Sequence, residues 1–474
     1  MNHATSDQSK SLMFWSIGLA AFWVIFLWGF FDDGPYTLGV NAAVFLFLAL
    51  GFFGFLFPSE FPLWRKKNYA WLVPFLLIAV SYAVYANPEV KAISIPVTAV
   101  LLVTFVTYAL FGDPRVRWGS SFVRTVIVRA FAWIVELGFS FALYVRLISG
   151  AHGSSTARRV VLGVILLVVV VSGAVVPLLS AADPLFGAFV RPFVDFLSRL
   201  IATETLVRII VGIVLAIGIL AVGLAWRKRP AVSGDDAPRA TDSIVAGIVV
   251  GGIFLVYVLF LAVQIKRLWV SELPIDFSET EALVKSGFWQ LFFLSIINGF
   301  IFLATYTKTN QWAQRLLTGF TIASLLLIFS AAWRMVLYVV FYGFSYEKFF
   351  ASYTVIFSII LFTWLVAQFA SKKRRDLVKF GVFLFLWMYA VLAIFPIDQF
   401  IMRTNLKLAE KSGSRIALFE MTMLSSDVLG YVEDRKDDPR FEGWGRWLKN
   451  RRDRSMERTW YEMSVSDVVY RLKH

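Results

Sequence analysis

Cysteine is absent from the 474-residue chain, and histidine occurs only three times, as His3, His152 and His474. A chain without thiols forms no disulfide and offers no thiolate for a metal site or for nucleophilic attack. Because the histidines lie outside the apolar segments, we also exclude haem held by histidine within a membrane span, a Ser–His intramembrane protease and a histidine-dependent acyltransferase. We expect no metal and no cofactor.

Charged residues are also scarce, at 16% of the chain, whereas hydrophobic residues make up 58% of it. A soluble domain has about 25% charged and about 45–50% apolar residues. Apolar runs of about 20 residues recur along the sequence, and each is long enough to cross about 30 Å of hydrocarbon as a helix. The sequence therefore predicts an all-α, polytopic helical membrane protein with interfacial amphipathic helices and a small helical C-terminal tail.

Apolar length and flanking charge predict about eleven transmembrane helices. Their expected ranges are 12–31, 38–57, 69–86, 92–111, 159–180, 205–226, 244–264, 287–305, 317–338, 351–370 and 378–397. The first run is longer and more aromatic than a cleaved signal peptide, so we count it as a span.

The loops between these spans differ in charge. One alternate set carries about three times as many Lys and Arg residues as the other, and basic loops stay on the cytoplasmic side. We expect a cytoplasmic N-terminus and, with an odd number of spans, a C-terminal tail outside. The net charge of +14 reflects this bias rather than a nucleic-acid partner.

The chain divides at a polar, proline-containing linker over residues 228–242. We expect a first membrane bundle of about six spans over 1–227 and a second of about five spans over 243–397. Residues 398–474 then form a helical C-terminal tail outside the membrane.

Residues 119–149 have the pattern of an amphipathic helix. At about 100° per residue, Arg124, Arg129, Glu136 and Arg146 share one side, and Trp133 adds an aromatic anchor. We expect a helix in the membrane-interface plane that is attracted to anionic cytoplasmic lipids. The alternative is a short hairpin that dips into the bilayer. Residues 184–201 show a second amphipathic pattern, which predicts either an outer interfacial helix or a cap on neighbouring spans.

Arg334 is a charged residue within an apolar span. Such a charge is costly unless it pairs with another group or lines a pathway for an ion or a substrate. Asp183 and Asp398 end other spans on the same predicted side. A ligand or ion site made of Arg334 with Asp183 or Asp398 is one interpretation. The alternative is that Arg334 reaches the headgroups or forms a purely structural ion pair.

Several stretches resemble one known family. They are SAADPLFGAF, with Ala181 at the position of the family's Ser; VKSGFWQLFFLSIIN, with Lys285 for Arg; the segment around Arg334; IDQFIMRTNL, with Pro396 for Asn; and LSSDVLGYV. Together they resemble the bacterial polytopic membrane family catalogued as domain of unknown function 4173, with the related 4153 family as the alternative. The resemblance implies a bacterial cytoplasmic (inner) membrane and no particular activity.

We expect a non-enzymatic envelope regulator or assembly factor whose partners are the lipid bilayer, anionic lipids and an envelope protein bound through the tail. A transporter of a small anion or proton-coupled solute is the alternative, with Arg334 and the outer carboxylates as its site. A membrane glycosyl transferase that uses Asp32 or Asp33 after the first span is the third candidate.

Overall fold

The structure is a computed structural model, and it is helical throughout the part of the chain that it describes. Described are residues 3–58, 66–111, 120–148, 204–228, 242–268, 293–371, 376–410 and 416–473, apart from positions 296, 303, 307 and 417. The predicted all-α class is confirmed for these residues. The predicted span 159–180, the amphipathic segment 184–201 and Asp183 lie outside them.

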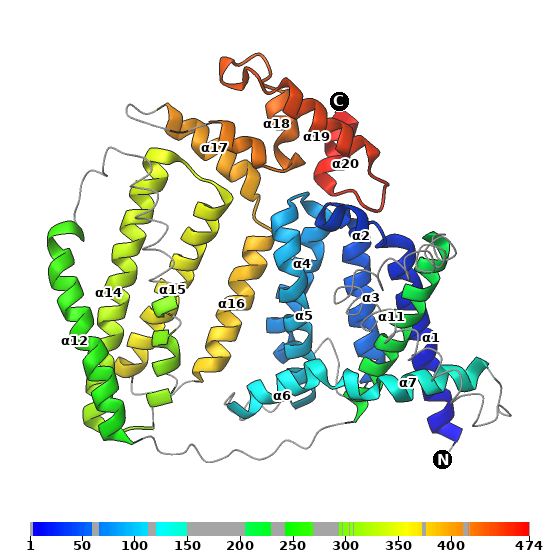
Figure 1. Cartoon of the computed structure of the whole chain (residues 1–474), viewed down its shortest axis with the longest axis horizontal. Helices are drawn as coiled ribbons and strands as arrows, with labels where there is room; N and C mark the ends of the chain where they lie inside the picture. The colour runs from blue at the N-terminus through cyan, green and yellow to red at the C-terminus, as the bar shows by residue number, and fades with distance from the viewer. Residues whose placement is uncertain are drawn as a thin grey trace, which may run out of the picture.

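Upright helices form the body of the molecule (Figure 1). The N-terminal part contributes α1 (His3–Phe26), α2 (Phe30–Asp33), the 3-10 turn Gly34–Thr37, α3 (Val40–Leu56), α4 (Lys66–Val84), α5 (Pro88–Phe111) and α11 (Glu204–Arg227). The later part contributes α12 (Ser243–Leu268), α14 (Gln311–Tyr342), α15 (Tyr346–Ser371) and α16 (Leu377–Ala393).

Polar residues set the ends of several upright helices. Asn310 caps α14 because its Oδ1 accepts the N–H of Ala313 at 3.0 Å, and Asp376 caps α16 in the same way through Lys379. Gly343 ends α14 with φ +71°, a conformation that glycine adopts without strain. These caps fix the helix ends on which the rest of the fold is built.

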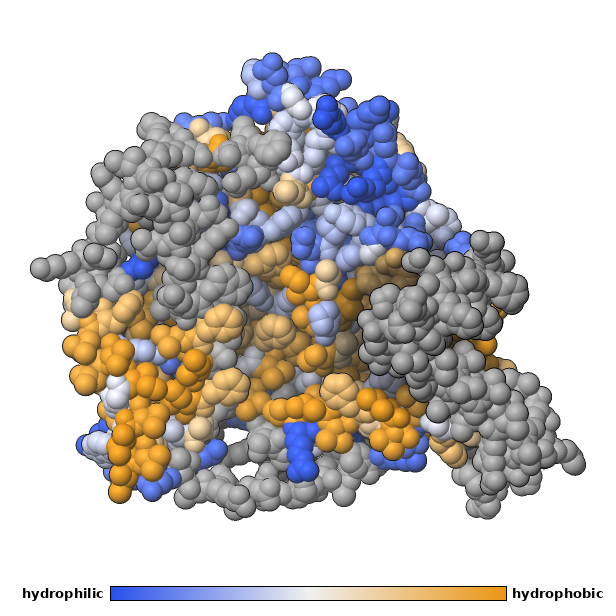
Figure 2. Space-filling view, in the orientation of Figure 1, coloured by the Kyte–Doolittle hydropathy of each residue, from blue (hydrophilic) through white to orange (hydrophobic). Residues whose placement is uncertain are grey.

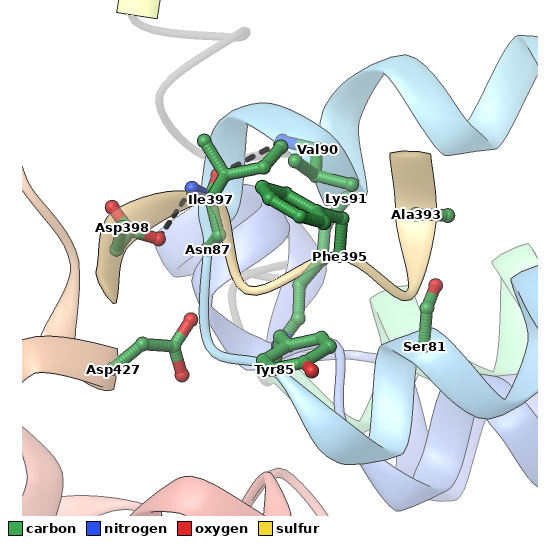
Figure 3. Close-up of a pocket in the computed structure, with 10 residues that line it drawn as sticks. All are labelled: Ser81, Tyr85, Asn87, Val90, Lys91, Ala393, Phe395, Ile397, Asp398 and Asp427. Carbon is green, nitrogen blue, oxygen red and sulfur yellow. Dashed lines mark hydrogen bonds between the residues drawn. The ribbon is translucent and has the colours of Figure 1, made fainter. Parts of the chain in front are cut away.

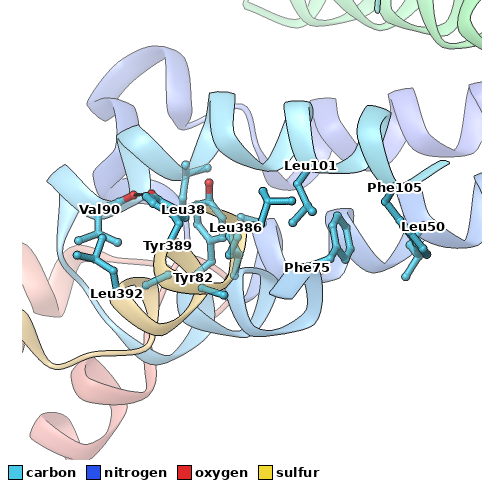
Figure 4. Close-up of a cluster of buried hydrophobic side chains, with 14 of the residues drawn as sticks. Leu38, Leu50, Phe75, Tyr82, Val90, Leu101, Phe105, Leu386, Tyr389 and Leu392 are labelled. Atoms are coloured by element: carbon cyan, nitrogen blue, oxygen red, sulfur yellow. Dashed lines mark hydrogen bonds between the residues drawn. The ribbon is translucent and has the colours of Figure 1, made fainter. Parts of the chain in front are cut away.

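The two larger hydrophobic cores of the described part of the chain lie side by side. The first joins α1, α3, α4, α5 and α11 to α16, and Figure 4 shows Phe75 and Phe105 from α4 and α5 together with Leu386 and Tyr389 from α16. The second lies among α12, α14 and α15 around Phe320 and Phe362. Because α16 packs in the first core, it connects the two parts of the body. The predicted division at 228–242 stays a prediction.

Among the described residues, six helices are long and apolar enough to span a membrane, or up to eight if each of two bent pairs is one span. The bent pairs are α1 with α2 and its following turn, at 57°, and α16 with α17 (Ile397–Ala409), at 71°. The shorter apolar helices α3 and α4 stand in the same body. The chain is therefore a multi-pass helical membrane protein, while eleven spans is more than the described residues support.

The predicted interfacial helix is two helices, α6 (Ser120–Phe131) and α7 (Trp133–Ile148). Residues Phe122–Arg146 pass the length and composition test for a span. In Figure 1, however, α6 and α7 run across the ends of the upright helices. Of the four charges expected on one side of this segment, Arg129 and Glu136 are buried, whereas Arg124 and Arg146 are exposed.

The tail forms a C-terminal module, residues 397–473, at the end of the body opposite the N-terminus (Figure 1). It comprises α17, the 3-10 turns Leu418–Met423, Ser426–Val428 and Pro439–Phe441, and the helices α18 (Leu429–Glu433), α19 (Gly445–Glu457) and α20 (Val465–Lys473). Figure 2 shows hydrophilic residues over this module and hydrophobic residues over the body below it.

The module docks directly on the helix ends. The N–H of Asn41 donates to the carbonyl of Tyr461 at 2.8 Å, next to Gly39 at the start of α3. A Cβ on Gly39 would lie 2.3 Å from the carbonyl oxygen of Glu462, so only glycine permits this approach. Asn405 of α17 also holds the α14–α15 turn, because its side chain bonds both the N–H and the carbonyl of Phe344.

Candidate functional site

A buried polar network lies where the C-terminal module meets the α4–α5 turn and the α16–α17 bend. Asn87 in the α4–α5 turn caps α5, because its Oδ1 accepts the N–H of Val90 at 3.0 Å. Its Nδ2 donates to Oδ2 of Asp398 at 2.6 Å. Figure 3 shows both bonds, with Asp427 of the module approaching from the same side.

Asp398 stands in the first turn of α17 and is 1% exposed. Besides Asn87, its carboxylate accepts hydrogen bonds from the hydroxyl of Tyr346, the N–H of Ser425 at 3.2 Å and the hydroxyl of Ser425 at 3.1 Å. A buried carboxylate needs such donors to offset the loss of water. Asp398 therefore joins α5, α15 and the module at one point.

Asp427 is the second buried carboxylate. Its oxygens accept the N–H of Ala86, at 2.8 and 3.0 Å, and the hydroxyls of Ser425 and Ser466. Burial, together with the neighbouring charge of Asp398, raises the pKa of Asp427 to about 6. Ser425 bonds both carboxylates, so the two acids form one connected group.

Asp467 in the first turn of α20 is the third buried carboxylate. Its ion pair with Arg458 is 2.7 Å long, and the two side chains are 0% and 8% exposed. Ser464 adds bonds from its N–H and its hydroxyl. Burial alone would raise the pKa of Asp467, but Arg458 and the Ser464 donors outweigh it and the pKa is lowered.

Lys91 supplies a buried cation next to these acids. It is 3% exposed, and its Nζ donates to the carbonyl of Leu38. The charge of Lys91 stabilises both carboxylates. It partly offsets the effect of burial on the pKa of Asp427, and it contributes to the lowered pKa of Asp467. With Lys91 and Arg458 facing Asp398, Asp427 and Asp467, the network holds cations and acids in nearly equal number.

The cavity at the centre of the network is small. Asn87, Lys91, Asp398 and Asp427 line it, and its volume is about 10 Å³. That is the space one water molecule needs. The cavity can hold a water molecule, but it has no room for an organic substrate. Among the described residues, no group of His, Cys, Asp and Glu is arranged to hold a metal ion.

Of the predicted ligand residues that the structure describes, Asp398 is part of this network and Arg334 is not. Asp398 lies at its centre, whereas Arg334 is half-buried on α14, about two turns before the helix ends. Asp183 lies outside the described residues. A site that joins Arg334 to these acids stays a prediction.

Lys91, Asp427, Arg458 and Asp467 are not among the site residues that the sequence predicts. Each had a weak local signal. Asp467 follows Ser464 at the three-residue spacing of a helix cap, and Asp427 follows Ser425 in a turn. Such signals indicate caps and turns, and only the fold brings them together.

The predicted interface residues fall into two groups. Arg124 and Arg146 are exposed, whereas Trp133 is half-buried against the first core. Arg129 is buried, with its guanidinium 5.3 Å from the ring centre of Trp226 at the end of α11. The outer side of α6 and α7 is apolar, with exposed Val123, Ile127, Phe131, Ile134, Val135 and Phe139.

Comparison with known proteins gives a family and no activity. No curated protein and no solved structure matches the chain. Residues 72–434 match the domain of unknown function 4153, the second of the two families that the motifs resemble. The match covers more than three quarters of the chain, including Asn87, Lys91, Asp398 and Asp427. The chain therefore belongs to the DUF4153 family of proteins.

Proposed function

We propose that this protein is a non-enzymatic regulator or assembly factor of the cell envelope, and that its C-terminal module binds an envelope protein. The observation that carries this proposal is the orientation of α20. Asp467 and Tyr470 face inward, whereas an apolar stripe faces outward, with exposures of 51% for Val465, 41% for Val468, 55% for Val469 and 84% for Leu472.

The spacing of this stripe is i, i+3, i+4, i+7, the pattern by which a helix anchors in a partner's hydrophobic groove. The buried Asp467–Arg458 pair fixes the opposite side of α20. The module therefore presents the stripe in one orientation, which lowers the entropy cost of binding. An exposed apolar stripe on an otherwise hydrophilic module is typical of a surface that binds another protein, and this supports the proposal.

The small cavity at Asp398 favours this function over transport or sugar transfer. A site with room for about one water offers no place for a solute or a lipid-linked sugar. We further propose that the module lies outside a bacterial cytoplasmic membrane, with the N-terminus and α6–α7 at the cytoplasmic side and the apolar side of α6–α7 in the lipid interface. The basic loops support this orientation.

The test is photo-crosslinking in cells. A photoreactive residue at Val469 is compared with one at Asn450, which is exposed on α19 outside the stripe. We expect a discrete protein adduct at Val469, identified by mass spectrometry, that is absent at Asn450 and disappears when Leu472→Asp is added. An adduct with lipid alone, or equal adducts at both positions, would contradict the proposal.

A further inference from the structure

A second, larger cavity lies on the C-terminal module, away from the buried carboxylates. It has a volume of about 460 Å³, within the range of pockets that hold small molecules. Helix α17 forms one wall, and α18 with the following turn forms the other. We call it the basic groove, and it is lined by Arg403, Leu406, Lys407, Glu410, Tyr431, Asp434, Arg435 and Arg440.

The two acids of the basic groove are already neutralised. Glu410 pairs with Arg440 at 3.0 Å, and Asp434 pairs with Lys473 at 2.8 Å. Arg440 is further held by Asp438 at 2.7 Å. The charge that remains available in the groove is therefore that of Arg403, Lys407 and Arg435.

Tyr431 organises the two arginines. The Arg435 guanidinium lies 3.9 Å from the centre of the Tyr431 ring, and that of Arg403 lies 5.7 Å from it. The Nη1 of Arg435 also donates to the carbonyl of Tyr431 at 3.3 Å. A guanidinium on a ring face directs its remaining N–H donors to its edge, where they match the oxygens of a phosphate. The groove thus holds two forked donors in place before any ligand arrives.

Lys407 adds a third cation one helical turn from Arg403. Like charges at i, i+4 destabilise a helix by about 0.2–0.5 kcal/mol. Within the described part of the chain, neither Arg403 nor Lys407 forms an ion pair with a carboxylate. The protein's own acids do not offset this repulsion, whereas an anion bound between Arg403 and Lys407 would.

We propose that the basic groove binds a phosphate-bearing ligand. The phosphate accepts bonds from Arg403 and Arg435, Lys407 adds charge, and the remaining volume takes the glycerol or sugar attached to it. Helix α17 lies across the end of the helical body (Figure 1), and the membrane placement proposed above puts this end near the lipid headgroups. The phosphate therefore comes either from a phospholipid headgroup or from a soluble phosphate ester.

The experiment uses the purified full-length chain in a nonionic detergent, titrated calorimetrically with two probes. Phosphatidylglycerol in mixed micelles, compared with zwitterionic phosphatidylcholine, represents the lipid source. Glycerol 3-phosphate represents the soluble source. Binding of phosphatidylglycerol alone assigns the groove to lipid, and binding of glycerol 3-phosphate as well assigns it to the phosphate group itself.

Variants then locate the binding. We expect Arg403→Ala and Arg435→Ala each to weaken it by about tenfold or more, because each removes a charge-assisted hydrogen bond. Lys436→Ala is the matched control: it removes one exposed positive charge beside Arg435 but does not line the groove. Arg435→Lys keeps the charge and loses the forked geometry, so it should also weaken binding.

All variants are checked for an unchanged thermal midpoint, which their exposed positions predict. Two results would overturn the proposal. One is that neither probe binds the natural chain. The other is that Lys436→Ala weakens binding as much as Arg403→Ala, because the attraction would then belong to the overall charge of the module and not to the groove.

Discussion

At one end of the helical body three carboxylates are buried in one polar network, whereas at the other end the charges of α6 and α7 divide into the buried Arg129 and Glu136 and the exposed Arg124 and Arg146. Where the C-terminal module docks, Asp398, Asp427 and Asp467 are at most 9% exposed and each accepts several hydrogen bonds. At the opposite end, Arg124 and Arg146 of α6 and α7 are exposed. Lys228, which pairs with Glu136 at 2.7 Å, is 67% exposed there.

This difference indicates a different role for each end of the body. Hydrogen bonds and ion pairs of buried charged groups are costly to break, and they form in one geometry only. The module therefore has a defined position on the body. Exposed cations beside an apolar helix face keep their water and adapt to a surface such as lipid headgroups. Changes at the module end should therefore affect stability, and changes at the other end should affect lipid preference.

The largest effect is expected from breaking the buried ion pair. Asp467→Ala leaves Arg458 buried without its carboxylate, which should cost about 3–5 kcal/mol and free α20 from the module. Limited proteolysis and denaturant unfolding in detergent measure this loss. Asp434→Ala removes the exposed pair with Lys473 and is the matched control, expected to cost about 0–1 kcal/mol. Equal losses would remove the distinction between buried and exposed pairs.

The pH dependence of docking tests Asp427. Its pKa of about 6 in the folded protein lies above the ordinary value of 3.8. The folded state therefore binds this proton more tightly, and the added stability is complete below about pH 4 and is lost as the pH rises through 6. The change amounts to up to about 3 kcal/mol.

The charged and titratable groups facing Asp427 are Asp398, Lys91, Tyr85 and Tyr346. The thermal midpoint is measured between pH 4.5 and 7.5 in the natural chain and in Asp427→Asn, which cannot ionise. We expect the natural chain to lose stability relative to Asp427→Asn across this range. A constant difference between the two proteins would show that Asp427 does not titrate there.

Gly39→Ala tests the close approach of the module to α3. The new Cβ would overlap the carbonyl oxygen of Glu462, so the 461–463 segment must shift, at about 1–3 kcal/mol. Gly18→Ala in α1 is the control, because no atom lies within 4 Å of its Cβ position. Proteolysis of the module should increase only for Gly39→Ala. If both variants behave alike, the contact with Glu462 is not a docking contact.

The smallest effect is expected at the opposite end. Replacing both Arg124 and Arg146 with Ala should leave stability in detergent unchanged and reduce the preference for anionic over zwitterionic lipid. Each arginine near an anionic surface contributes about 1 kcal/mol at low salt. Lipid preference is measured by reconstitution into phosphatidylglycerol and phosphatidylcholine nanodiscs. A lower thermal midpoint with unchanged lipid preference would mean that these arginines are structural.

The sequence predicted much of the fold and one residue of the buried polar network, Asp398. Apolar length located α3 and α14 closely, since 38–57 was expected for Val40–Leu56 and 317–338 lies within Gln311–Tyr342. Asp398 was identified because it ends an apolar span on the same predicted side as Arg334. Asp427 and Asp467 did not, because in a polar tail an acid is ordinary until the fold buries it.

Two further features could not be predicted from sequence patterns, because both depend on contacts between distant parts of the chain. The inward side of α6–α7 is set by where α11 ends, so burial of Arg129 against Trp226 depends on a helix far away in sequence. The basic groove depends on Tyr431 lying opposite α17, and nothing in the spacing along the chain encodes that distance. Periodicity identifies faces of a helix, whereas contacts between helices decide which face is buried.

The most direct test of the account is whether the two ends face different compartments. The chain has no cysteine, so Asp437→Cys on the module and Ser371→Cys at the far end of α15, both exposed positions, are unique labels. Intact cells are treated with a membrane-impermeant maleimide, before and after permeabilisation. The account predicts that Asp437→Cys reacts in intact cells and Ser371→Cys only after permeabilisation. Protection of Asp437→Cys with labelling of Ser371→Cys, or equal labelling of both, would contradict it.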